Sequence, residues 1–241
     1  MTLVSMYLVF TVLPEQRRRR AEAILLSLGK IVDSSDGSGH LELSGLWKSK
    51  ESERVTEVSS GRRQLQGISI DDLRRDSSTI SALATATGLL EIEINTSDLE
   101  FADLSKVVSS LPGLLHLRLK ECRVKLQPTL RLSSRSLESL EFIDCKFEGT
   151  SPTKPFRLGN LREVGFGETK LSPEFLDCFL SCNRLEAISL SKTAIGDAAI
   201  DSLSRMCRLK RIRIDGAKLS KYGKTHLKLV QPSAELVDDD S

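Results

Sequence analysis

Few residues of this chain have the types and spacing that catalysis or metal binding needs. Cys178 and Cys182 are four positions apart, so a helix would place both thiols on one face, where they could bind a metal or form a redox pair. No histidine or second cysteine pair accompanies them, so we interpret them as packed core thiols. The glycine pair of GFGETK, from Gly165, resembles a phosphate cradle but lies within a predicted strand, not in a loop before a helix.

The other reactive side chains form no catalytic set. His40, His116 and His226 are scattered, and no carboxylate pair accompanies any of them. Five cysteines without a C-x-x-C pair give no zinc pattern, and the odd number argues against a disulfide framework, so reduced thiols are expected. We therefore expect a protein that is not an enzyme, with no cofactor, no metal site and no small-molecule substrate.

Composition limits the possible partners. The chain has 35 basic and 33 acidic residues, which gives a net charge of +2. Because no face-wide basic excess is available, a nucleic-acid-binding protein is not expected. Its 241 residues are enough for one extended structure with a small N-terminal piece, rather than two globular cores.

A leucine-rich pattern recurs every 23 to 25 residues along most of the chain. It indicates a leucine-rich repeat solenoid, in which each repeat packs only against its neighbours. A weaker seventh copy, LQGISIDDL from Leu65, precedes six that fit L-x-x-L-x-L-x-x-[N/C/T]-x-L. The six are LLEIEINTSDL from Leu89, LLHLRLKECRV from Leu114, LESLEFIDCKF from Leu137, LREVGFGETKL from Leu161, LEAISLSKTAI from Leu185 and LKRIRIDGAKL from Leu209.

The pattern predicts an α/β fold with a right-handed, curved parallel sheet, and with helices and irregular turns on the convex side. Positions four and six of each copy point inward from a short strand, so strands are expected near residues 68, 92, 117, 140, 164, 188 and 212. Position nine enters the interior, where a small polar side chain can bond peptide groups that lack partners. It is occupied by Ser97, Cys122, Cys145, Thr169, Thr193 and Ala217.

The second half of each repeat should return along the convex side. Helical spacing predicts helices in SSTISALATATG (closed by Gly88), ADLSKVVSSL, GDAAIDSLSRM and SPEFLDCFLSC, where Ser172 is the expected N-cap and Pro173 the first helical residue. Prolines in KLQPTLRLSS and EGTSPTKPF predict irregular returns there.

Residues 1–30 suggest a membrane-proximal segment. Residues 1–14 begin with an uncharged stretch of roughly 20 Å as a helix, short of the ~30 Å hydrocarbon core, so we interpret them as the remnant of a membrane helix. A buried capping strand or helix is the alternative. Residues 15–30 predict an Arg-rich amphipathic helix whose basic run suits lipid headgroups on the cytoplasmic side. That run is Arg17, Arg18, Arg19 and Arg20.

The remaining boundaries follow the repeats. Residues 31–64 are expected to form a loop and an N-terminal cap, in which the strand-like HLELSGL and Trp47 close the first turn. Residues 65–237 hold about seven repeats and a C-terminal cap, and residues 238–241 form an acidic tail.

The string EQRRRRAEAILLSLGKIV, after an apolar segment, and the repeat SLSKTAIGDAAIDSL resemble the leucine-rich repeat proteins of planctomycete bacteria. In those proteins a membrane helix precedes an Arg-rich helix ending in Leu-Gly-Gly, then the repeats, then a closing P-x-x-x-V strand. Leu28, Gly29 and QPSAELV match, whereas Lys30 replaces the second glycine and the apolar segment is short. The repeats also resemble the cysteine-containing subclass of eukaryotic F-box receptors, but no F-box-like module precedes them.

The concave strand face, where positions three, five and seven point outward, is the expected binding surface. Strands about 4.8 Å apart would let Glu93, Arg118 and Glu141 pair laterally, as a solvated ion ladder of small energetic value. Beyond them, small residues form a trough that could seat a protein loop or strand, or could reflect sequence drift. The candidate partner-binding residues are Glu91, Glu93, His116, Arg118, Lys120, Glu141, Glu163, Gly165, Ser189, Arg211 and Arg213.

These features favour a non-enzymatic protein-protein interaction scaffold. We expect a membrane-associated protein whose repeats face the cytoplasm, with an unknown protein partner and an anionic membrane surface as a second contact. The alternative is a soluble cytoplasmic substrate-recognition subunit of an enzyme complex.

Overall fold

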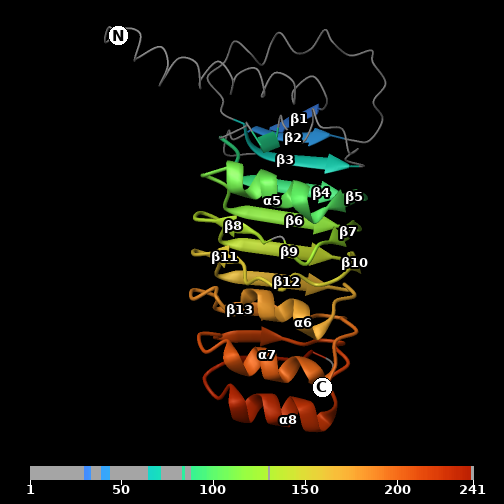
Figure 1. The fold of residues 1–241 in the computed structure, drawn as a ribbon, viewed down its shortest axis with the longest axis vertical. Helices are drawn as coiled ribbons and strands as arrows, with labels where there is room; N and C mark the ends of the chain where they lie inside the picture. The colour runs from blue at the N-terminus through green and yellow to red at the C-terminus, as the bar shows by residue number, and fades with distance from the viewer. Residues whose placement is uncertain are drawn as a thin grey trace, which may run out of the picture.

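The structure, a computed structural model, describes residues 30–33, 39–43, 65–71, 83–84, 88–129 and 131–239. One ten-stranded sheet runs through this part of the chain, in the order β1-β2-β3-β4-β6-β9-β12-β13-β14-β15. Every neighbouring pair is parallel except β1 and β2, which are antiparallel. Figure 1 shows the strands stacked like rungs, with the colour passing steadily from blue to red along the stack.

Each of the seven expected repeat strands is present, so the predicted leucine-rich repeat solenoid is confirmed. The strand expected in HLELSGL is β2, and the closing strand in QPSAELV is β15. The sheet consists of β1 (Lys30–Asp33), β2 (Gly39–Leu43), β3 (Leu65–Asp71), β4 (Glu91–Asn95), β6 (His116–Lys120), β9 (Ser139–Ile143), β12 (Glu163–Gly167), β13 (Ala187–Ser189), β14 (Arg211–Arg213) and β15 (Glu235–Val237).

The core is a set of columns, each built from the same position of successive repeats. Positions one, four and six are fully buried in all six well-matched copies, as in Leu114, Leu117 and Leu119 of β6 and its approach. Each column buries apolar side chains against the repeats on both sides, so a single repeat has no core of its own. Stability is therefore shared along the stack.

Position eight of each of the six well-matched copies adopts a left-handed backbone conformation, which the sequence pattern did not reveal. In the first five of these copies the N–H of that residue donates to the position-seven carbonyl of the next repeat, for instance from Glu121 to Ile143 at 2.8 Å and from Lys192 to Asp215 at 2.6 Å. This bond extends the ladder past the strand while the chain turns inward. The positive φ angles lie between 47° and 63°, at Thr96, Glu121, Asp144, Glu168, Lys192 and Gly216.

The returns are partly helical, as expected. Figure 1 shows the helices following one another along the stack in chain order. They are α5 (Phe101–Ser110), α6 (Pro173–Leu176) with the 3-10 turn η2 (Asp177–Phe179), the 3-10 turn η3 (Asp197–Ala199) with α7 (Ile200–Arg205), and α8 (Lys221–Val230). Ser172 has N-cap backbone geometry before Pro173, but its side chain makes no capping hydrogen bond; its hydroxyl pairs with Ser151 at 2.9 Å. Helix α8 was not predicted.

The two proline-containing returns are extended rather than helical, which confirms the irregular turns. Short strands pair in parallel there, one set of three and one set of two. The set of three is β7 (Arg123–Leu126) and β10 (Lys146–Gly149) with β5 (Asp98–Glu100), which lies in the preceding return just before α5. The set of two is β8 (Ser133–Ser134) with β11 (Arg157–Leu158).

Phenylalanines fill the space inside these irregular returns. Phe142 and Phe166 stack in adjacent strands, with ring centroids 5.5 Å apart, and Phe175 lies edge-on to both. Phe156 packs against Phe175 and Phe179. The large rings supply apolar area where an α-helix is missing from the convex layer.

Several predictions fall wholly or partly outside the described residues. These are the apolar segment 1–14, the run Arg17 to Arg20, Trp47 and most of the helix expected to end at Gly88. Lys30 begins β1, so the boundary predicted for a helix over residues 15–30 was wrong at its last residue. Among the helices that the structure describes, none is both long and apolar enough to cross a bilayer.

Candidate functional site

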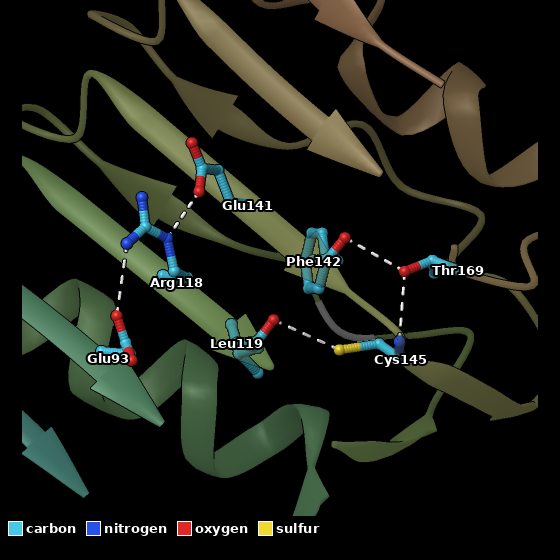
Figure 2. Close-up of polar contacts among 7 residues, drawn as sticks. All are labelled: Glu93, Arg118, Leu119, Glu141, Phe142, Cys145 and Thr169. Atoms are coloured by element: carbon cyan, nitrogen blue, oxygen red, sulfur yellow. Dashed lines mark hydrogen bonds and ion pairs between the residues drawn. The ribbon is translucent and has the colours of Figure 1, made fainter. Parts of the chain in front are cut away.

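Three charged side chains lie side by side on the concave face, as predicted. Nε of Arg118 on β6 donates to a carboxylate oxygen of Glu141 on β9 at 2.6 Å. Nη1 of the same guanidinium lies 3.3 Å from a carboxylate oxygen of Glu93 on β4. Figure 2 shows the guanidinium between the two carboxylates. The hydrogen bond and the charge of Glu141 raise the pKa of Arg118 above its ordinary value. Because all three side chains are partly exposed, this row adds little to stability.

The other charged candidates of the N-terminal half surround this row. Glu91 and His116 pair across β4 and β6 in the strand register, and both are exposed. Lys120 lies 3.7 Å from Glu121, a contact between neighbours in sequence. These three residues therefore share a surface with Arg118 but are not joined into one network by the contacts described.

The central part of the concave face carries only glycine and serine at its outward positions, and we call these four residues the bare stretch. Gly165 and Gly167 of β12 lie beside Ser189 of β13 and Ser191 after it, and these two hydroxyls are 3.0 Å apart. A Cβ added at Gly165 would lie 3.5 Å from the Cγ of Glu141, and one at Gly167 would lie 3.9 Å from the Ile143 side chain. Both are ordinary contact distances, and neither glycine has a positive φ. The fold therefore does not require glycine at either position.

Opposite charges flank this bare stretch. Glu163 is exposed at the start of β12, and Arg211 and Arg213 are exposed on β14. Each arginine has one acidic neighbour at a distance that is long for an ion pair: Glu235 lies 3.8 Å from Arg211, and Asp215 lies 3.7 Å from Arg213. Such long, exposed contacts leave both guanidinium groups able to bind a partner.

Asp215 is a residue of this surface that the sequence reasoning left out of the candidate set. One of its oxygens accepts a hydrogen bond from Ser191 at 3.0 Å and lies near Arg213. It thus anchors the serine edge of the bare stretch to the arginine strand. The available signal was its place at position seven, beside Ser191 at the same position of the preceding repeat and two residues after Arg213.

The position-nine column is structural, as predicted. The Cys145 thiol donates to the Leu119 carbonyl at 3.4 Å, and Thr169 donates to the Phe142 carbonyl at 3.0 Å while accepting from the Cys145 N–H at 3.1 Å (Figure 2). Cys122 donates to Ile94 in the same way, at 3.3 Å. A side chain from one repeat thus bonds the backbone of the repeat before it.

Four cysteines are buried inside the solenoid: Cys122, Cys145, Cys178 and Cys182. Burial raises the pKa of Cys178 to about 12 and that of Cys182 to about 11. The hydrogen bond with Cys122 and burial raise the pKa of Cys145. Such thiols stay protonated and are poor nucleophiles, whereas Cys207 is exposed.

A separate hollow of about 270 Å³ opens at the edge where the strands turn. Within it Arg123 lies 3.2 Å from Asp98, and the same arginine lies 3.4 Å from Glu148 outside the hollow. No group of histidines, cysteines and carboxylates in the described ranges is arranged to hold a metal. The hollow is lined by Thr96, Ser97, Asp98, Glu121, Cys122, Arg123, Asp144 and Lys146.

Two solved structures resemble this chain distantly. No protein-family model matches the chain, and no curated protein does. A solved protein from Bacteroides fragilis is 16% identical over 82% of this chain and 73% of its own, with a TM-score of 0.42. An internalin from Listeria monocytogenes is 11% identical over 96% of this chain and 95% of its own, with a TM-score of 0.27. Likenesses this weak do not indicate what the chain binds.

Proposed function

We propose that this protein is a non-enzymatic interaction scaffold that binds a protein partner on its concave face. The observation that carries the proposal is the bare stretch over Gly165, Gly167 and Ser189, because ordinary side chains would fit at both glycines. Main-chain groups and small polar residues thus remain accessible to a partner segment. Solenoids of this kind offer extended concave surfaces for binding.

The charges around the bare stretch indicate which charges the partner segment should carry. Glu163 and the second oxygen of Glu141 lie on one side, and Arg211 and Arg213 lie on the other. A partner loop or strand with a basic residue at one end and an acidic residue at the other would satisfy both sides. Such complementarity acts mainly on the association rate and on partner choice.

Filling the bare stretch tests this proposal. The variant Gly165→Thr with Gly167→Thr should keep or slightly raise thermal stability, because glycine weakens a strand by roughly 0.5 to 1 kcal/mol. It should lose the partner that the wild type captures in a pulldown. Ser139→Thr, on the same face outside the bare stretch, is the control and should capture the partner normally. Equal capture by the filled variant would place the binding site elsewhere.

We further propose that residues 1–20 hold the scaffold at a membrane. The support is the uncharged stretch from Met1 to Leu13 followed by Arg17 to Arg20, which suits an anionic headgroup layer. The alternative, a soluble recognition subunit of an enzyme complex, predicts that the protein stays in the supernatant after membranes are pelleted. Fractionation of the full chain, compared with a chain lacking residues 1–20, distinguishes the two.

A further inference from the structure

Cys122 and Cys145 lie directly beside each other in the position-nine column. The backbone is in parallel register on both sides of them. Lys120 pairs with Ile143 just before the two cysteines, and the Lys146 N–H donates to the Cys122 carbonyl at 2.9 Å just after them. The two cysteines are therefore one strand spacing apart, about 4.8 Å between Cα atoms.

This spacing suits a disulfide bond. Bridged cysteines have Cα atoms roughly 4.4 to 6.8 Å apart and Cβ vectors that do not diverge. Both thiols point to the interior in the same way, since Cys122 donates to the Ile94 carbonyl at 3.3 Å and Cys145 donates to the Leu119 carbonyl at 3.4 Å. The pair therefore meets both conditions.

Cys122 differs from the other buried thiols in its acidity. The hydrogen bond from the Cys145 thiol lowers the pKa of Cys122, and the Ser97 backbone adds to this effect, whereas burial acts in the opposite direction. The same hydrogen bond and burial raise the pKa of Cys145. The pair thus combines a thiol that ionises readily, at Cys122, with one that stays protonated, at Cys145. Only the ionised form is a good nucleophile.

The other pair of buried thiols lacks such a nucleophile. The Cys178 thiol donates to the Pro152 carbonyl at 3.3 Å, and Cys182 is hydrogen-bonded to the backbone of Leu158. Burial raises the pKa of Cys178 to about 12 and that of Cys182 to about 11. These two thiols are therefore expected to stay reduced, and they provide an internal control.

The hollow at the edge where the strands turn gives small molecules a route toward this pair. Cys122 is one of its lining residues, yet only 2% of Cys122 is exposed, which keeps bulky reagents away from its sulfur. The hollow has a volume of about 270 Å³. Because a molecule of liquid water occupies about 30 Å³, hydrogen peroxide, which has one more oxygen atom, fits within it.

We propose that peroxide joins Cys122 and Cys145 in a reversible disulfide bond between two neighbouring repeats. The Cys122 sulfur attacks one oxygen of hydrogen peroxide, so that an S–O bond forms and the O–O bond breaks. The other oxygen leaves as hydroxide and becomes water by taking the proton that Cys122 released.

The second step closes the bridge. The Cys145 sulfur attacks the Cys122 sulfur, an S–S bond forms, and the S–O bond breaks. The departing hydroxide takes the Cys145 proton and leaves as a second water. The two thiols are thereby oxidised and the peroxide is reduced. This site lies inside the solenoid, away from the bare stretch, so the proposal does not depend on the proposed function.

Mass spectrometry of the peroxide-treated chain tests this bond. The Cys207→Ser chain, in which the exposed thiol is removed, is treated with hydrogen peroxide while folded, and the remaining thiols are alkylated after unfolding. The number of alkylated thiols should fall from four to two, and a disulfide should join the tryptic peptides of Cys122 and Cys145. Dithiothreitol should restore all four. Cys122 should lose its free thiol at least about tenfold faster than Cys178 and Cys182 do, because only the thiolate attacks.

Two single substitutions in the same background assign the roles. Cys145→Ser removes the second thiol, so oxidation should stop at a Cys122 sulfenic acid that dimedone traps. Cys122→Ser removes the attacking thiol, so Cys145 should stay reduced. Serine suits this column, since Ser97 and Thr169 already occupy position nine of neighbouring repeats. Cys178→Ser is the matched control and should form the bridge at the parent rate.

Three results would overturn the proposal. One is a folded Cys207→Ser chain that keeps all four thiols at a peroxide concentration that oxidises Cys207 in the wild type. Another is oxidation of Cys178 and Cys182 as fast as that of the position-nine pair. The third is a folded Cys122→Ser variant in which Cys145 is oxidised at the parent rate. Circular dichroism melts check the folding of each variant, and the first two results need no substitution inside the core.

Discussion

Asp197 holds Ser220 by two hydrogen bonds, one from the Ser220 N–H at 2.8 Å and one from its hydroxyl at 2.5 Å. Ser220 in turn caps α8, because its side-chain oxygen accepts from the Gly223 N–H at 2.9 Å. A carboxylate that precedes α7 thus fixes the start of the last helix.

Gly223 is expected to be essential for this contact. In an unobstructed helix Gly→Ala stabilises by about 1 kcal/mol. Here an added Cβ would overlap the Asp197 carboxylate, so Gly223→Ala should displace that carboxylate from Ser220 and lower the free energy of unfolding. In an Asp197→Ala background the same change should become neutral or stabilising. Chemical denaturation of the wild type, the two single variants and the double variant measures the coupling between the two residues. Additive effects on the free energy of unfolding would contradict it.

The same carboxylate should make stability depend on pH. The hydrogen bonds from Ser220 lower the pKa of Asp197. The unfolded chain therefore binds the proton more readily, so the contribution of Asp197 is present above the unfolded pKa, about 4, and is lost as pH falls through the folded pKa. The melting temperature of the wild type should exceed that of Asp197→Asn at pH 7, and the difference should shrink below pH 4. A difference that is constant from pH 7 to pH 3 would refute the assignment.

Much of the fold was predictable because its signal is periodic. Position one is leucine and positions four and six are apolar in all six well-matched copies, and each of these side chains is buried, so the parallel sheet followed from spacing alone. The ion row of Glu93, Arg118 and Glu141 was predictable for the same reason, since register places equal positions of adjacent repeats side by side.

What the sequence did not reveal depends on single, non-repeating contacts. Helix α8 begins KYGKTH, with four exposed residues and a glycine near its start, so its apolar spacing is weak. It forms because Ser220 caps it and Leu227 is buried against the core. The left-handed column at position eight was equally hidden, because five of its six residues are not glycine.

The cysteines provide an independent check of the interior. A bulky thiol reagent at pH 8 should modify one thiol per native chain, Cys207, and five after unfolding. The four buried thiols are inaccessible, and burial keeps Cys178 and Cys182 protonated at this pH. Cys207→Ser should abolish the native reaction. Rapid native modification of Cys122 or Cys145, mapped by mass spectrometry, would mean that the position-nine column is open to solvent.

Charge reversal on the last strand of the concave face tests how the partner is recognised. Arg211→Glu with Arg213→Glu should weaken partner capture and remove most of its salt dependence, because rim charges act through long-range attraction that salt screens over about 10 Å at 0.1 M. Stability should change little, since both side chains are exposed and their acidic neighbours lie 3.7 to 3.8 Å away. Lys154→Glu with Arg157→Glu changes the charge equally on an exposed return and should capture the partner with wild-type salt dependence. If both double variants weaken capture alike, overall charge is responsible; if the first has no effect while folded, the arginine side of the concave face is not part of the binding site.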